Sequence, residues 1–219
     1  MRSVARYILC SLALAVTVAA PVHARTGTEM RGFIMETLDG LSFTRCGGRT
    51  AAMVVDGTPA QALSQAIGAI RPVMSDQSRP IYVELAGQPA GNRLNVTRLL
   101  RLIGHVEDCA SAPTDVPAGT RLAAVGIDEP WSLVVTAGGA TFRAIAAKPS
   151  RFGAAAFARP TAEEPGRRTF DAWSQLDGGT LRIEFVEELC LDTGAEAAYG
   201  ARVTGRFGHQ ALEGCASRY

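Results

Sequence analysis

The sequence lacks the residue patterns that mark common catalytic and nucleotide-binding sites. It contains no G-x-S-x-G, H-E-x-x-H, Walker A or G-x-G-x-x-G pattern. Lysine occurs only at Lys148, and 22 basic residues nearly cancel 21 acidic ones. Such a balance provides no excess positive charge to attract nucleic acid or an anionic membrane, so neither is expected as a partner. Composition therefore predicts no enzyme class and no cofactor.

Long apolar runs are also missing, apart from one at the N-terminus. Arg2 and Arg6 precede an apolar run over 7–20, and a small-residue site ends at Ala24. These are the three parts of a bacterial signal peptide. The run has about 14 residues, fewer than the roughly 20 that span a bilayer, and Cys10 lies too early in it for lipoprotein processing. We expect cleavage after Ala24 and a periplasmic mature chain without a transmembrane segment.

Cysteine usage agrees with export. Four cysteines remain after cleavage and are expected to form disulfides in an oxidising compartment: Cys46, Cys109, Cys190 and Cys215. Four cysteines allow three pairings. Metal binding is disfavoured, because no two cysteines have C-x-x-C spacing and His105 and His209 lie in no cluster of ligand residues.

A Pro-, Ser-, Thr- and Gly-rich segment, 111–119, reads as a linker. It divides the chain, after the signal peptide 1–24, into domains 25–110 and 120–219. Two cysteines lie on each side of it, so the most economical pairing is one disulfide in each half.

The first half predicts five strands and a helix. β-rich runs separated by turn residues lie at 30–36, 41–46, 50–55, 80–86 and 93–102. Between the third and fourth runs, Thr58 is expected to cap a helix that begins at Pro59, with Gln61 completing a capping box. The helix is expected to present one apolar face, formed by Leu63, Ala66, Ile67 and Ile70. This order suits an OB-like five-stranded barrel with one helix.

The second half predicts almost only strands. They are expected at 131–136, 140–146, 168–175, 181–186 and 199–206. Phe170, Ala172, Ser174 and Leu176 alternate with polar residues, as do Leu181, Ile183 and Phe185, which predicts a hairpin with one buried face. We expect a small antiparallel β barrel or curled sheet, with a long loop over 148–167. The fold class is therefore mainly β, in two small domains.

Isolated chemical groups give weaker signals. His105 beside Glu107 and Asp108, or His209 in a turn, could serve a hydrolase, but surface histidines are the more economical interpretation. Methionine thioethers bind Cu(I), yet Met30 and Met35 differ by an odd number of positions, and a regular strand would place them on opposite faces. Trp131 and Trp173 could form the floor of a ligand pocket, although filling the core is the more usual role.

Residues 29–110 resemble the second domain of the new-lipoprotein-E (NlpE-like) family of copper-homeostasis and adhesion lipoproteins. The resemblance is carried by Arg31-Gly32-Phe33, Ser42-Phe43-Thr44-Arg45-Cys46, Gly48-Arg49, Pro80-Ile81-Tyr82-Val83, Gly87 and Cys109. It implies an OB-like fold with a Cys46–Cys109 bridge. The matching region does not include the family's first domain, which carries a C-x-x-C motif and a lipid anchor.

The second half resembles an uncharacterised periplasmic β domain often found beside such modules. The matching residues are Glu129-Pro130-Trp131, Cys190-Leu191-Asp192, Tyr199 and Gly214-Cys215. No activity is implied by this resemblance.

We therefore expect a non-enzymatic periplasmic accessory protein linked to envelope homeostasis or stress, which binds an envelope protein or a cell-wall component. The alternative is a small-molecule or copper-binding protein, and a hydrolase is the weakest hypothesis. The sequence names neither the partner nor an oligomeric state.

Overall fold

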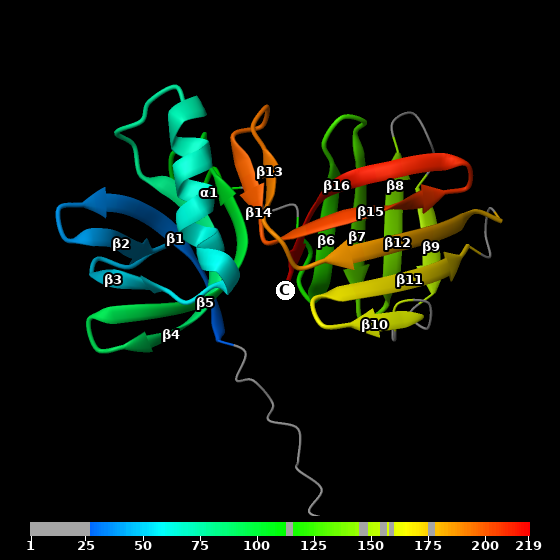
Figure 1. Cartoon of the computed structure of the whole chain (residues 1–219), viewed down its shortest axis with the longest axis horizontal. Helices are drawn as coiled ribbons and strands as arrows, with labels where there is room; N and C mark the ends of the chain where they lie inside the picture. Colours follow the sequence, from blue (N-terminus) through cyan, green and yellow to red (C-terminus); the bar gives the residue numbers. More distant parts are fainter. Residues whose placement is uncertain (1–26, 113–115, 145–148, 154–156, 158–159, 175–177) are drawn as a thin grey trace, which may run out of the picture.

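The computed structural model describes residues 27–112, 116–144, 149–153, 157, 160–174 and 178–219. The expected signal peptide, 1–24, lies outside the described residues, as does part of the expected linker, 113–115. In the described part of the chain, no helix has the length and apolarity needed to cross a membrane. The strands there form two sheets, A and B, which lie side by side (Figure 1).

Five strands of the first half close into a barrel. They are β1 (Thr28–Thr37), β2 (Gly40–Arg45), β3 (Ala51–Asp56), β4 (Ile81–Ala90) and β5 (Arg93–Ile103). The ring runs β1-β2-β3-β5-β4 and closes through the β1–β4 pairing. Every pairing in it is antiparallel except β3–β5, which is parallel. This closed ring with its single helix confirms the OB-like barrel expected from the sequence.

The helix α1 (Ala62–Ile70) packs on the barrel through the expected apolar face. Leu63, Ala66, Ile67 and Ile70 are all buried in the core that the barrel strands share. The expected start was wrong, because the helix begins three residues after Pro59. Residues Pro59–Gln61 form a short 3-10 turn, η1, and a second turn, η2 (Arg71–Val73), follows the helix.

Asp56 explains the later start. Its carboxylate accepts hydrogen bonds from the backbone N–H and hydroxyl of Ser64, at 2.8 and 2.7 Å, so it satisfies the first turn of the helix. The Thr58 hydroxyl still accepts from the N–H of Leu63 at 3.2 Å. Gln61 adopts a left-handed conformation at φ 55° and belongs to no capping box.

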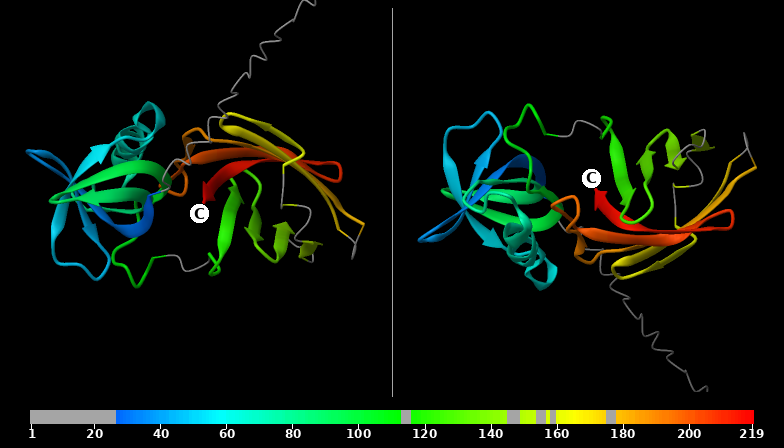
Figure 2. Two further views of the ribbon diagram at one scale, coloured as in Figure 1. Left: turned by 90° about the horizontal axis from the view of Figure 1, so that it is seen from below. Right: turned by 90° about the horizontal axis from the view of Figure 1, so that it is seen from above.

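Nine strands of the described second half form sheet B. They are β6 (Thr120–Gly126), β7 (Trp131–Thr136), β8 (Gly139–Ala144), β9 (Ser150–Gly153), β10 (Ala162–Glu164), β11 (Arg167–Trp173), β12 (Thr180–Val186), β15 (Ala201–Phe207) and β16 (Gln210–Arg218). The order is β10-β11-β12-β15-β16-β6-β7-β8-β9, and the sheet curls around one apolar core (Figure 2). This confirms the curled antiparallel sheet.

Several sequence expectations for the second half needed correction. Strands β6 and β16 were not predicted at all, nor was a short hairpin with strands at 190–192 and 197–199. The expected loop over 148–167 contains two strands, β9 and β10, although some of its residues lie outside the described part. The predicted hairpin, now β11 and β12, has the expected buried face, with Leu181, Ile183 and Phe185 at most 2% exposed. Leu176 lies outside the described residues.

A hairpin from the second half completes sheet A. Strands β13 (Cys190–Asp192) and β14 (Ala197–Tyr199) pair with each other, and β14 pairs with residues 101–103 of β5. β3 pairs with β5 only as far as Val96, so the hairpin occupies the edge that β3 leaves open. Ala198 of the hairpin is buried in the barrel core.

The two disulfides are Cys46–Cys109 and Cys190–Cys215, as predicted. The first ties the turn after β2 to the segment after β5. The second has both cysteines in the second half of the sequence, yet it connects β13 of sheet A to β16 of sheet B. The predicted pairing is confirmed, and in space this bridge joins the two sheets.

Candidate binding site at the junction of the two sheets

Three charged residues lie in one row across the outer side of the barrel. Strand register places Arg31 of β1 opposite Glu84 of β4, and Glu84 opposite Arg101 of β5. Residues Ile81, Val83 and Leu85 of β4 point into the barrel core, so alternation puts Glu84 on the outer face. Glu84 and Arg101 are nevertheless only 7% and 6% exposed, because the second half of the chain covers them.

A β-bulge beside this row is the point at which the second half of the chain binds the barrel. Glu84 faces Arg101 while Leu85 faces Leu99, which leaves Leu100 as an extra residue in β5. Its carbonyl accepts hydrogen bonds from the N–H of Gly200 at 3.1 Å and from the hydroxyl of Ser217 at 2.8 Å. The bulge therefore supplies the acceptor by which β15 and β16 dock on the barrel.

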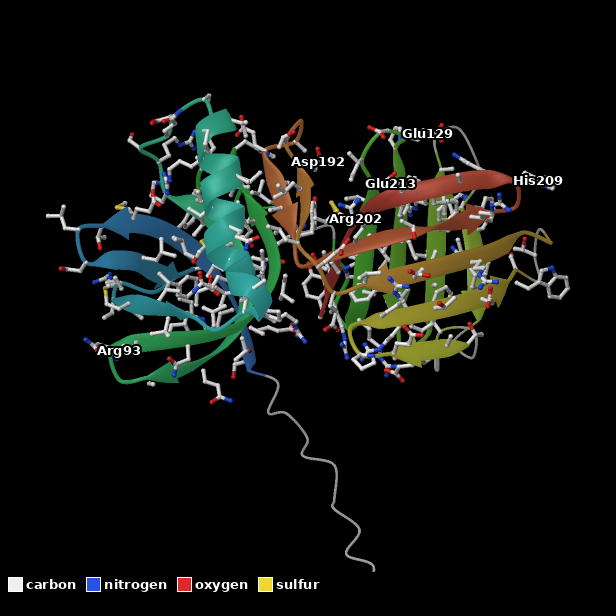
Figure 3. All side chains as sticks on the ribbon, viewed as in Figure 1. Arg93, Glu129, Asp192, Arg202, His209 and Glu213 are labelled. Carbon is white, nitrogen blue, oxygen red and sulfur yellow. A yellow bond between two sulfur atoms is a disulfide. The ribbon has the colours of Figure 1, made fainter. Side chains whose placement is uncertain are left out.

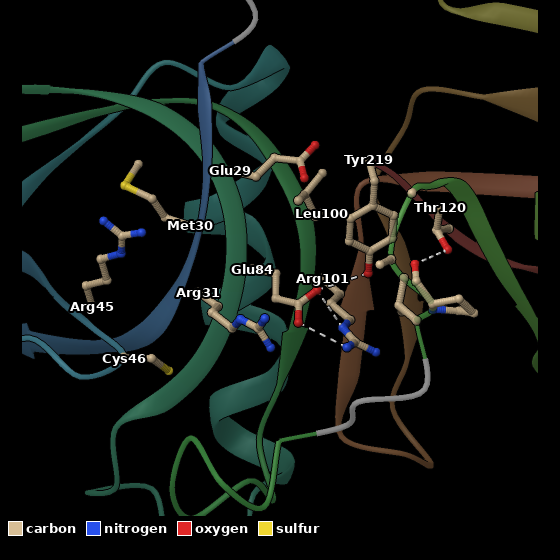
Figure 4. A pocket seen from close by; sticks show the side chains of 14 residues that line it. Glu29, Met30, Arg31, Arg45, Cys46, Glu84, Leu100, Arg101, Thr120 and Tyr219 are labelled. Atoms are coloured by element: carbon tan, nitrogen blue, oxygen red, sulfur yellow. Dashed lines mark hydrogen bonds and ion pairs between the residues drawn. The ribbon is translucent and has the colours of Figure 1, made fainter. Parts of the chain in front are cut away.

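The Glu84 carboxylate accepts four hydrogen bonds. Those from Arg101 and Tyr219 are drawn in Figure 4. The Arg101 guanidinium donates two, from Nε at 2.9 Å and from Nη2 at 3.0 Å. The Tyr82 hydroxyl donates one at 2.8 Å from the same strand, and the Tyr219 hydroxyl donates one at 3.0 Å from the end of the chain. A carboxylate has about four acceptor positions, so Glu84 is saturated.

Both tyrosines are held in the protonated form. Burial raises the pKa of Tyr82 above its ordinary value of 10.0, and the hydrogen bond and negative charge of Glu84 raise it further. Burial and the charge of Glu84 likewise raise the pKa of Tyr219. Because Glu84 of the barrel accepts a hydrogen bond from Tyr219 at the end of the second half, this buried cluster links the two sheets.

A cavity of about 560 Å³, the junction cavity, opens beside this cluster. Five charged side chains line it: Glu29, Arg31, Arg45, Glu84 and Arg101. Both acids are engaged, Glu29 by Arg98 at 3.4 Å and Glu84 by Arg101. Among the described residues neither Arg31 nor Arg45 forms an ion pair, so the lining retains an excess of positive charge.

A second cavity of about 640 Å³ continues from the first over strands β6–β9. The two cavities share Arg101, Val116, Pro117 and Tyr219. Arg143 and Arg151 line the second one, and no acidic residue is among the described residues around it. Thr141 is paired with Arg151 across β8 and β9, which places both arginines on one face of sheet B. Together the two cavities form one groove, the junction groove, whose charge suits an acidic group.

The residues of the second resemblance have mainly structural roles. Trp131 is 5% exposed and packs on Phe142, with ring centroids 6.0 Å apart. A Cβ atom on Gly126 or Gly214 would come within 2.6 or 2.7 Å of the Trp131 ring. Glycine at these positions therefore makes room for the Trp131 ring.

The other motif residues are dispersed. Phe43 is buried in the barrel core, and a Cβ on Gly32 would overlap the backbone of β2. Exposed Glu129, next to Pro130, accepts a hydrogen bond from Gln210 at 2.7 Å, and Asp192 accepts one from Ala195 within the β13–β14 turn. Four motif residues line the two cavities, namely Arg31, Arg45, Cys46 and Tyr199.

The histidine, methionine and tryptophan candidates do not converge. His105 and His209 are both exposed, and His209 lies at the far end of the β15–β16 hairpin (Figure 3). Met30 is 8% exposed and Met35 46% exposed, which confirms that the strand puts them on opposite faces. Trp173 is 61% exposed and Trp131 fills the core. No cluster of three or more metal-binding His, Cys, Asp or Glu side chains occurs in the described part of the chain.

Comparison with protein-family models, with curated proteins and with solved structures finds no match to this chain.

Sequence reasoning missed most of the groove. Glu84, Arg101, Arg143, Arg151 and Tyr219 occur in no motif, and in a strand pattern each reads as an ordinary outward-facing or terminal residue. One signal was present: the charged pair lies in strands rich in apolar residues, in the segments Ile81–Ala90 and Arg93–Ile103. Nothing local in the sequence indicates that the second half covers them.

Proposed function

We propose that this chain is a non-enzymatic exported accessory protein that binds an acidic group of an envelope protein or cell-wall component in the junction groove. The observation that carries the proposal is the groove's charge, with arginines on both cavities and both lining carboxylates already paired. Arginine forks are well suited to carboxylates and phosphates. The two disulfides are typical of an exported chain.

The proposal keeps the periplasmic location and the link to envelope homeostasis that the signal peptide and the NlpE-like resemblance imply. A binding role is favoured over catalysis because the junction carboxylates are engaged by arginines and leave no free base. The barrel and the curled sheet hold the groove from two sides, so its shape is set before a ligand arrives.

Co-sedimentation of the mature protein with purified cell-wall sacculi, and pull-down from envelope extract, test this proposal. Arg31→Glu and Arg143→Glu each reverse one charge in the groove and should weaken retention about tenfold, more strongly at low salt. Arg93→Glu is the matched control, since Arg93 is exposed at the tip of the β4–β5 hairpin, away from the junction (Figure 3). If Arg93→Glu weakens retention as much as the groove variants, binding reflects net charge and the proposal is wrong.

A further inference from the structure

A separate cavity of about 350 Å³ lies inside the curl of sheet B, and we call it the inner cavity. Most of the described residues that line it are apolar: Leu122, Val135, Phe157, Pro160, Phe170, Ile183 and Phe185. Apart from Pro160, these residues belong to the core of the curled sheet or pack against it. Protein interiors are normally close-packed, and this volume falls in the range of small-molecule sites, about 300–1,000 Å³.

Three arginines and Glu163 also line the inner cavity, and Arg121 is exposed, so we place the charged residues at the mouth of the cavity. Arg168 lies two positions before Phe170 in β11, and Arg218 two positions after the core residue Ala216 in β16. Alternation therefore places both on the inner face of the sheet. A register shift in β6 between Thr120 and Leu122 makes Arg121 the extra residue of a β-bulge, a feature that commonly redirects a side chain.

The charges at the mouth do not cancel. Arg168 is paired with Glu163 at 2.7 Å, and Arg218 with Glu187 at 2.5 Å. Arg121 also lines the cavity, and among the described residues it forms no ion pair. An apolar interior is thus combined with one available guanidinium at its opening.

We propose that the inner cavity binds a single saturated acyl chain ending in a carboxylate, with the chain among the apolar walls and the carboxylate paired with Arg121. A guanidinium can hold a carboxylate through two parallel hydrogen bonds. A methylene group is similar in size to a water molecule, which takes about 30 Å³, so the cavity holds about ten methylene groups. That volume fits one medium-length chain and not the two chains of a phospholipid. This site is independent of the junction groove.

Isothermal titration of the delipidated mature protein with dodecanoate, below its micelle concentration, tests the assignment. One molecule should bind per chain, and dodecyltrimethylammonium, with the same chain but a positive head group, should bind at least tenfold more weakly. Arg121→Gln should weaken dodecanoate binding about tenfold, because it removes a charge-assisted hydrogen-bonded pair. Arg206→Gln is the matched control, since Arg206 is an exposed arginine of β15 in the same sheet.

A wall variant, Val135→Phe, narrows the cavity without changing charge and should also reduce binding while circular dichroism shows a folded protein. Equal binding of the two amphiphiles, unchanged affinity in Arg121→Gln, or no saturable binding would each overturn the proposal. Lysophosphatidylglycerol provides a second anionic head group, and its binding in place of dodecanoate would reject the carboxylate assignment.

Discussion

The clearest prediction concerns the two tyrosine hydroxyls that share the Glu84 carboxylate. Tyr82→Phe and Tyr219→Phe each delete one oxygen and leave the ring in place. Tyr82 donates from within the barrel, and Tyr219 donates across the junction from the end of the second half. The two variants therefore remove the same group from the same acceptor. Only the Tyr219 hydrogen bond joins the two sheets, so the difference between the variants reports on that junction.

The size of each effect follows from the geometry. A hydrogen bond to a charged group contributes about 1.5–3 kcal/mol to stability. Glu84 keeps both bonds from Arg101 in either variant, so values near the lower end are expected. Tyr82 is fully buried, and its loss should cost about 2 kcal/mol of unfolding free energy. Tyr219 is partly exposed, and its loss should cost about 1.5 kcal/mol.

Urea unfolding, followed by tryptophan fluorescence and far-UV circular dichroism, measures these values. Both tryptophans belong to sheet B, so fluorescence reports on the second half, while dichroism reports on both sheets. The double variant should lose more than the sum of the single losses by about 0.5 kcal/mol or more, because one carboxylate serves both donors. A neutral Tyr219→Phe, or strict additivity, would refute the shared-acceptor account of the junction.

Other predictions follow from the same contacts. Stability should fall above about pH 10, because the phenols of the unfolded chain ionise there while the raised pKa values of Tyr82 and Tyr219 keep the folded ones protonated. Urea unfolding at several pH values should show a smaller fall in each Phe variant. Gly200→Ala should strongly destabilise the protein in thermal melts, since the new Cβ would overlap a carbonyl oxygen of β5. Cys190→Ser removes a bridge between cysteines 25 positions apart and should cost about 3.5 kcal/mol in urea unfolding, with increased hydrogen exchange in the β13–β14 hairpin of sheet A. Dialysis against Cu(I) should leave less than one tightly bound equivalent, and a stoichiometric site that disappears in Met30→Leu would contradict this.

The features predicted correctly from the sequence are those governed by local periodicity. The buried face of α1 and the alternation of Leu181, Ile183 and Phe185 depend on spacing within one element, and both match the observed burial. The helix start was wrong because Asp56, six residues before Ala62, satisfies the first turn from outside the helix. A capping box involves only residues adjacent to the start of the helix, so Asp56 forms no part of that sequence pattern.

Three of the missed strands, β13, β14 and β16, have patterns that depend on tertiary contacts. β13 and β14 have three residues each, too few to show a period of two. β16 ends with four consecutive buried residues before Arg218, because its last part is enclosed between the two sheets. A strand buried on both faces loses the alternation by which a half-buried strand is recognised. The junction residues Glu84 and Arg101 were missed for the same reason, since their burial is imposed by the other half of the chain.

The arrangement of the hairpin also determines how the two halves depend on each other. If each half were independent, cutting the linker would release two stable fragments. Here the barrel without residues 190–199 would expose the β5 edge that β14 covers and would lose buried Ala198 from its core. The second half without the barrel would keep its hairpin attached through Cys190–Cys215. The N–H of Gly200 would, however, lose the Leu100 carbonyl as its acceptor. Both groups of contacts are buried, so neither loss is fully compensated by water. The halves should therefore unfold together, and the groove between them should exist only while both are folded.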